Sequence, residues 1–180
     1  DKLKITQEDR GRTQSYQQQV ERARLQESSA NFEDFLANLQ LKCEIGKAAD
    51  EQIPRVSQLS LRTNQFNSTT VRLSESDINR LVSREKKVIW TVDVSDRFGD
   101  YGLVGVVIFE QQEGSIEVES FMLSCRVLGR GVEHKILQEL GKKAVAANCK
   151  FVSIKFQPTA KNVPILNFLT EIGERHKTGD

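Results

Sequence analysis

The chain has 180 residues, of which 38% are hydrophobic and 28% are charged, and its formal net charge is +1. This is the balance of a soluble globular protein rather than a disordered one, and the length suits one domain with an appendage. The near-neutral charge creates no field that would recruit nucleic acid or an anionic membrane, and no apolar run approaches the roughly 20 residues that span a bilayer.

The first third of the chain is predicted to be helical. Residues 6–28 form a polar helix with a narrow apolar seam of Tyr16, Val20 and Ala23. A second helix follows Asn31 and a third begins near Pro54, because apolar residues recur there at the i, i+3, i+4, i+7 spacing of a buried helix face. These apolar residues are Phe32, Phe35, Leu36 and Leu39 in the second helix, and Ile53, Val56 and Leu59 in the third.

After residue 69 the pattern changes to strands and helices in the order β-α-β-β-β-α-β-α. Strands are predicted where apolar and polar residues alternate or where short apolar runs occur, and helices where the period is 3.6. In the helix over 131–148, one face carries Val132, Ile136, Leu140 and Val145. The predicted strands are 69–73, 86–97, 102–110, 116–125 and 150–156, and the other helices are 74–81 and 163–173.

Three cysteines, Cys43, Cys125 and Cys149, lie far apart in the chain. Their spacing is not that of a zinc or redox motif, so we expect free thiols, no metal site and a cytoplasmic location. Cys43 and Cys149 have apolar, strand-like neighbours and are predicted to be core residues.

A glycine-containing loop joins the strand ending at Cys125 to the helix after Gly131. Its residues, Arg126, Leu128, Gly129, Arg130 and Gly131, include the pattern R-x-x-G-x-G. Glycines allow a tight turn, and a helix start offers unpaired N–H groups and a positive dipole end, so the loop could bind a pyrophosphate or a phosphopantetheine phosphate. The alternative is a turn with no ligand, because short glycine patterns often occur without one.

The loop and the order of elements resemble the GNAT acyltransferase fold, in which this loop holds the pyrophosphate of acyl coenzyme A. A wider set of segments, including "FEDFLANLQLKCEI", "SDRFGDYGLVGV", "LSCRVLGRGVE" and "PTAKN", resembles the carboxy-terminal half of FkbH-like proteins. The resemblance implies an α/β fold: a mixed, mostly antiparallel sheet flanked by helices. It implies a GNAT-like domain over 54–180, preceded by a helical linker over 1–53.

The FkbH-like resemblance also implies a function. Such proteins join a phosphatase domain of the haloacid dehalogenase type, which uses magnesium, to a GNAT-like domain. They transfer a glyceryl unit from 1,3-bisphosphoglycerate to an acyl carrier protein for polyketide biosynthesis. The expected partners are therefore a carrier protein and an upstream phosphatase domain, and the expected ligand is phosphopantetheine or coenzyme A, with no tightly bound cofactor in this half.

Two departures limit what the resemblance implies. No D-x-D phosphatase motif is present, since Asp93 and Asp96 have the wrong spacing. Leu169 stands where many GNAT enzymes have a tyrosine general acid, so ordinary amine acetylation is doubtful. The alternatives to an acyltransferase are a module that only docks the pantetheine arm and, less favoured, a coenzyme A-dependent N-acetyltransferase.

Within this framework several residues are candidates for the chemistry. Cys125 could carry the acyl group, since thiols beside positive charge and a helix start are often reactive, although most free cysteines are simply buried. His134 could deprotonate a thiol or could simply face solvent. Residues that could bind the hydroxylated acyl group, or could only form turns, are Asn64, Gln65, Asn67, Asp96, Arg97, Asp100 and Asn162.

Overall fold

The structure, a computed structural model, describes residues 7–173, 175 and 178. The chain divides into two compact units. Unit 1 comprises Asp1–Lys42 and Val94–Gly102, and unit 2 comprises Cys43–Asp93 and Leu103–Asp180.

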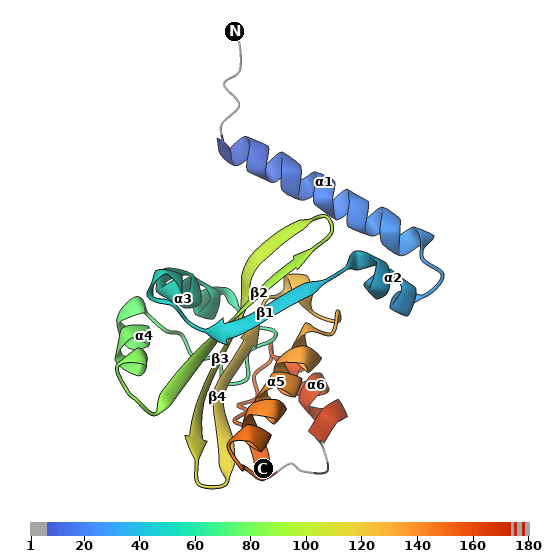
Figure 1. The fold of residues 1–180 in the computed structure, drawn as a ribbon. Helices are drawn as coiled ribbons and strands as arrows, with labels where there is room; N and C mark the ends of the chain where they lie inside the picture. Colours follow the sequence, from blue (N-terminus) through green and yellow to red (C-terminus); the bar gives the residue numbers. More distant parts are fainter. Residues whose placement is uncertain (1–6, 174, 176–177, 179–180) are drawn as a thin grey trace. The chain divides into compact units, whose positions relative to one another are not determined.

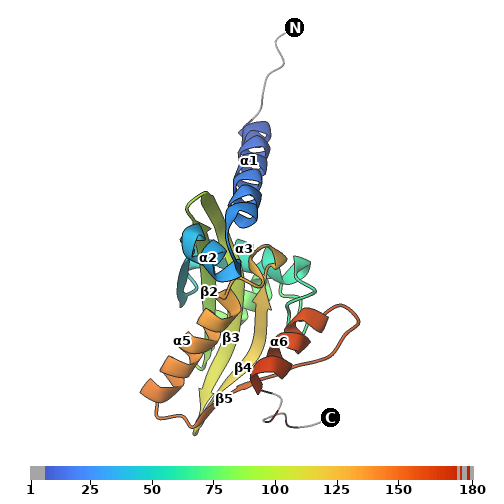
Figure 2. The same cartoon turned by 90° about the vertical axis from the view of Figure 1, so that its right-hand side faces the viewer.

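The strands of the described residues form a five-stranded sheet in the order β1-β2-β3-β4-β5, of which β1 to β4 are labelled in Figure 1. β3 and β4 are antiparallel, whereas β5 lies beside β4 and runs parallel to it, as Figure 2 shows. The expected mixed sheet flanked by helices is therefore confirmed. The strands are β1 (Lys42–Lys47), β2 (Lys87–Asp96), β3 (Gly99–Gln112), β4 (Ser115–Leu123) and β5 (Phe151–Ile154).

The helices expected from the 3.6-residue period are all present, with ends within a few residues of those predicted. No helix in the described part of the chain is long and apolar enough to cross a membrane. The helices are α1 (Gln7–Ser28), α2 (Phe32–Leu39), α3 (Ile53–Arg62), α4 (Glu75–Val82), α5 (Val132–Ala146) and α6 (Val163–Gly173), with short 3₁₀ turns η1 (Asp50–Gln52) and η2 (Cys125–Val127).

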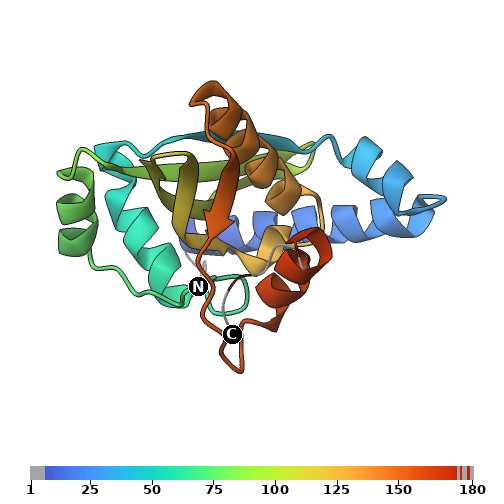
Figure 3. The same cartoon turned by 90° about the horizontal axis from the view of Figure 1, so that it is seen from below.

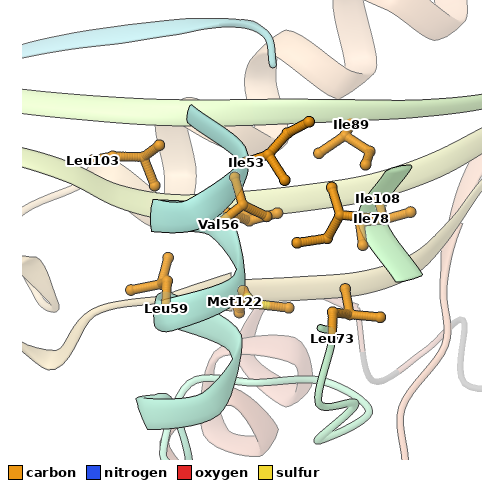
Figure 4. Packing of buried hydrophobic residues seen from close by; sticks show 10 residues of the cluster. Ile53, Val56, Leu59, Leu73, Ile78, Ile89, Leu103, Ile108 and Met122 are labelled. Carbon is orange, nitrogen blue, oxygen red and sulfur yellow. The ribbon is translucent and has the colours of Figure 1, made fainter. Parts of the chain in front are cut away.

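The core of unit 2 lies on both faces of the sheet. α3 and α4 lie on one side of the sheet and α5 on the other (Figure 3). On the first side, Ile53, Val56 and Leu59 of α3 point toward the strands, as their spacing predicts, and meet Ile78 of α4 (Figure 4). On the other side, α5 buries the predicted residues Val132, Ile136 and Leu140. Val145 was predicted to join them, but it is 80% exposed, because the buried face continues at Ala144, four positions after Leu140, and Val145 lies one position beyond it.

Unit 1 differs from the sequence prediction in which face of α1 is covered. Of the predicted seam, Tyr16 is 68% exposed and Ala23 is also exposed, whereas Arg22, one position earlier, is buried. α2 begins as predicted, since the Asn31 side chain caps it by accepting from the Asp34 N–H. Phe35 and Leu39 of α2 are buried. Burial in α1 is thus decided by a polar contact rather than by an apolar stripe.

Two strand predictions need correction. β1 lies within the segment expected to be a helical linker, 1–53. Residues 69–73, predicted as a strand, are irregular, and Thr70 has a φ of +54°, which interrupts an extended conformation. The contact with the sheet is made earlier in the chain, where an isolated antiparallel bridge pairs Asn67 with Met122 of β4.

Candidate functional site

The candidate site lies in unit 2, where the chain passes from β4 to α5. β4 ends at Leu123, and the Ser124 N–H donates to the Val104 carbonyl at 2.7 Å, which holds the chain to β3 as it leaves the sheet. Ser124 then caps η2, because its side chain accepts from the Arg126 N–H. Cys125 was predicted to be the last residue of the strand; it is instead the first residue of η2. Its thiol is free and the residue is exposed.

Two glycines of the loop have the conformation that the sequence prediction required. Gly129 has a φ of +74° and Gly131, the residue before α5, has a φ of +85°. Nothing lies within 4 Å of a Cβ built at either position. The requirement for glycine is therefore conformational and not one of space, since side-chain-bearing residues rarely adopt positive φ.

This requirement gives a paired stability prediction. Replacing Gly131 with alanine should lower the free energy of unfolding by about 1 kcal/mol, because alanine is strained at positive φ. Replacing Gly141, which lies inside α5 with nothing within 4 Å of its built Cβ, should raise it by about 0.5–1 kcal/mol, because alanine favours helix. Urea denaturation of both variants measures the difference. Equal effects at the two positions would contradict the conformational account of the loop.

Glu133, in the first turn of α5, was missed by the sequence analysis. The Gly129 N–H donates to its Oε1 at 3.0 Å, so one backbone donor of the loop is already bound by the chain's own carboxylate. Glu133 is only 7% exposed, and its Oε2 is buried without a hydrogen-bond partner in the described structure. The signal in the sequence was an acidic residue two positions after the G-x-G pattern. Its importance depends on the side chain turning back into the loop.

Beyond β5, the edge of β4 is covered by the segment Phe66–Ser68. The Ser68 N–H donates to the Phe121 carbonyl at 3.0 Å and the Leu123 N–H donates to the Phe66 carbonyl at 2.9 Å. The Ser68 side chain accepts from the Phe121 N–H at 2.9 Å, and its carbonyl accepts from the Gln157 N–H at 2.8 Å. These bonds occupy the strand edge, so an extended ligand cannot add to β4 between Phe121 and Leu123.

Aromatic rings pack beside this covered edge. Phe66 lies edge-on to Phe121, with ring centroids 5.2 Å apart, and 5.6 Å from Phe168 of α6. The ring of His134 stands perpendicular to Phe168 at 5.1 Å, and the residue is otherwise exposed. No hydrogen bond joins His134 to Cys125 in the described residues, so its role as a base stays a prediction.

The predicted amide-bearing residues separate into two kinds. Asn67 and Asn162 are brought together, since the Asn162 Nδ2 donates to the Asn67 carbonyl at 3.1 Å. Both are almost fully buried, and their side chains bond to backbone groups of turns, which gives them a structural role. Asn64 accepts from Arg72, and Gln65 is exposed, so these two amides lie nearer the surface.

Asp96, Arg97 and Asp100 belong to unit 1, at the turn between β2 and β3. The Arg22 guanidinium donates to both Asp96 oxygens, at 2.7 and 3.0 Å, and the Tyr101 hydroxyl donates at 2.7 Å. The backbone N–H groups of Phe98 and Gly99 also donate to Asp96. Its side chain has no exposed surface, so these contacts give Asp96 a structural role.

The other two residues of this turn also bond to the backbone of unit 1. Arg97 bonds to the Asn38 carbonyl, and Asp100 accepts from the Gly102 N–H. The turn is thus held by its own polar contacts, and acyl binding by any of its residues stays a prediction.

Cys43 and Cys149 were predicted to be core residues, but both are only half-buried. Cys43 lines a hollow of about 230 Å³ together with Ile45, Trp90, Lys135 and Glu139. Burial raises the pKa of the Cys43 thiol above its ordinary value. Across the described residues no group of three or more His, Cys, Asp or Glu side chains is placed to hold a metal ion.

No protein-family model matches the chain, and no curated protein matches it in sequence. Solved structures do match in fold. One is an acetyltransferase from Trypanosoma brucei, at 15% identity and a TM-score of 0.54 over 77% of this chain and 96% of that one. Another is a ribosomal-protein-alanine N-acetyltransferase from Brucella melitensis biovar Abortus 2308, at 12% identity and a TM-score of 0.53 over 77% and 92%.

A third match is Rv2747 from Mycobacterium tuberculosis, solved in complex with CoA, at 16% identity and a TM-score of 0.52 over 74% of this chain and 69% of that one. The chain has the GNAT fold. In this fold the loop from Arg126 to Gly131 links β4 to α5, as the sequence predicted. At these identities the likeness shows the fold alone, and function has to be argued from the site.

Proposed function

We propose that this GNAT domain transfers a small acyl group, glyceryl, to the phosphopantetheine thiol of an acyl carrier protein. The observation that carries the proposal is the exposed free thiol of Cys125, directly before the glycine loop. A buried thiol could serve packing alone, but an exposed one is open to a substrate carbonyl and to a carrier thiol.

Two steps would move the acyl group. In the first, the Cys125 thiolate attacks the carbonyl carbon of an acyl phosphate, a C–S bond forms, and the C–O bond to phosphate breaks as phosphate leaves with the electron pair. In the second, the carrier thiolate attacks this thioester and Cys125 leaves as a thiolate. The reactant and the product of the second step are both thioesters. The free-energy change of the exchange is therefore small, and the acyl group can pass to the carrier. The thiol protons go to solvent or to a base, for which His134 is the candidate.

The proposed reaction also needs components that the 180 residues do not supply. An upstream phosphatase domain with magnesium would remove the phosphate that remains on the glyceryl unit. The partners are therefore that domain and the carrier protein. The fold is compatible with this proposal because related structures include acetyltransferases, which also transfer acyl groups.

A coenzyme A-dependent N-acetyltransferase is the second candidate, favoured by the N-acetyltransferase among the structural matches. Leu169 of α6 argues against it, since a leucine side chain cannot donate a proton to a leaving thiolate. A docking module without chemistry is the third candidate, and the covered edge of β4 between Phe121 and Leu123 would require the pantetheine arm to bind elsewhere on the domain.

The substrate assay follows directly. With 1,3-bisphosphoglycerate and the phosphatase domain supplied, the chain should add one glyceryl mass to the carrier that bears phosphopantetheine, and none to the unmodified carrier. Acetyl coenzyme A with amine substrates should give no acetylated amine. Intact-protein mass spectrometry measures both. Amine acetylation with no dependence on the modified carrier would replace the proposal with the second candidate.

A further inference from the structure

Glu133 places a negative charge at the start of α5. The first N–H groups of a helix have no partner within the helix, and together with the helix dipole they attract an anion. The Glu133 carboxylate lies in this first turn, and its Oε1 accepts from the N–H of Gly129, in the loop before the helix, at 3.0 Å, so it places a negative charge beside the helix start. The position that a phosphate oxygen would take at Gly129 is therefore already filled.

The second oxygen of the same carboxylate has a different environment. Glu133 Oε2 is buried and has no hydrogen-bond partner among the described residues, although the residue is only 7% exposed. A buried acceptor without a partner is unfavourable, and such atoms are few in folded proteins. Because a carboxylate oxygen only accepts, a ligand would satisfy it by donating an N–H or O–H group.

We propose that Glu133 is a specificity residue that closes the loop to phosphate groups and accepts a hydrogen bond from an uncharged part of the ligand. If the ligand is a pantetheine arm, which rests on the proposed function, the donors are its amide N–H and hydroxyl groups. The R-x-x-G-x-G loop of this chain then recognises the arm without its phosphates. Free coenzyme A gains nothing there from its diphosphate, and the thiol arm alone decides recognition.

The test is Glu133→Gln in the full chain, with inorganic pyrophosphate and pantetheine as probes. Glutamine keeps the shape and can still accept from Gly129, but it replaces the Oε2 acceptor with an amide donor and removes the charge. Pyrophosphate should bind the variant at least about tenfold more tightly than the wild type, because the carboxylate charge that repels an anion from the helix start is gone. Pantetheine should bind about fivefold more weakly, because one accepted hydrogen bond is lost. Isothermal titration calorimetry measures both.

Glu139→Gln is the matched control. It removes the same charge from the same helix, where Glu139 pairs with Lys135 and Lys142 at 3.0 and 2.8 Å. Neither probe should change affinity in this variant. Pyrophosphate binding by the wild type as tight as by Glu133→Gln, or weakening of both probes together, would overturn the proposal. Circular dichroism checks the fold, and since pyrophosphate binding needs no acyl transfer, its result stands apart from the proposed reaction.

Discussion

Replacing Cys125 with alanine should abolish carrier loading, with the acyl-enzyme mass lost from the peptide that contains this position. The reason is that no other thiol can take its place: the described structure leaves Cys125 exposed and Cys43 and Cys149 half-buried. Stability should stay within about 0.5 kcal/mol of the wild type, as for most exposed positions. Peptide mass spectrometry of the reaction, run with the phosphatase domain and the modified carrier, measures the effect.

Cys43→Ala and Cys149→Ala serve as controls and should load the carrier normally. Cys125 should also react with iodoacetamide faster than the other two. It is the exposed thiol, whereas burial raises the pKa of Cys43 and leaves less thiolate at neutral pH. A Cys125→Ser variant should also fail, because a hydroxyl stays protonated and its oxygen ester is too stable to pass on the acyl group. Normal loading by Cys125→Ala would rule out the covalent step at this thiol and leave direct transfer to the carrier or a docking module.

Replacing Asp96 with alanine should destabilise unit 1 by about 3–5 kcal/mol. The change removes the acceptor that Arg22, whose side chain is only 10% exposed, shares with the Tyr101 hydroxyl and two backbone N–H groups. Arg22 also stacks on the Tyr101 ring, 4.4 Å from its centroid, so both contacts should loosen together. Hydrogen exchange of α1 amides, together with chemical denaturation, measures the loss.

Asp100→Ala is the control in the same turn. Asp100 is exposed and accepts one bond, from the Gly102 N–H at 2.6 Å, so its replacement should change stability by no more than about 1 kcal/mol. If the two variants lost equal stability, the Arg22–Asp96 contact would not be what holds α1.

The Asp96 carboxylate makes the stability of unit 1 depend on pH. Burial would raise the pKa of Asp96, but hydrogen bonds from Arg22, Tyr101 and the Phe98 N–H outweigh it and hold the pKa below its ordinary value. The stabilisation is therefore complete above the ordinary aspartate pKa of about 3.9 and is lost as the pH falls through the lower folded-state value. Exchange rates of α1 amides in Asp96→Asn and the wild type should converge at low pH. A constant difference at every pH would contradict this.

The sequence determined the parts of this protein that depend on local pattern. The helix period predicted α2, α3 and α5 and the buried faces of α3 and most of α5, and strand alternation predicted β2 to β5. The tight turn at Gly129 and Gly131 also followed from sequence, and the positive φ of both residues is a conformation that glycine tolerates. β1, in contrast, was missed, because "KCEIGK" holds only two apolar residues, Cys43 and Ile45, which is too short an alternation to stand out from the helical pattern before it.

Only the tertiary structure decided the contacts between distant residues. Asn162 bonds to the Asn67 carbonyl across 95 positions, and Arg22 reaches Asp96 across 74. Residues 69–73 have strand-forming side chains, yet the edge of β4 is taken by Phe66–Ser68 instead. The orientation of Glu133 into its loop was equally invisible. Periodicity in the sequence indicates which face of a helix or strand is apolar. The pairing of polar groups depends instead on which elements fold against one another, because a buried polar atom bonds to whichever partner the fold places beside it.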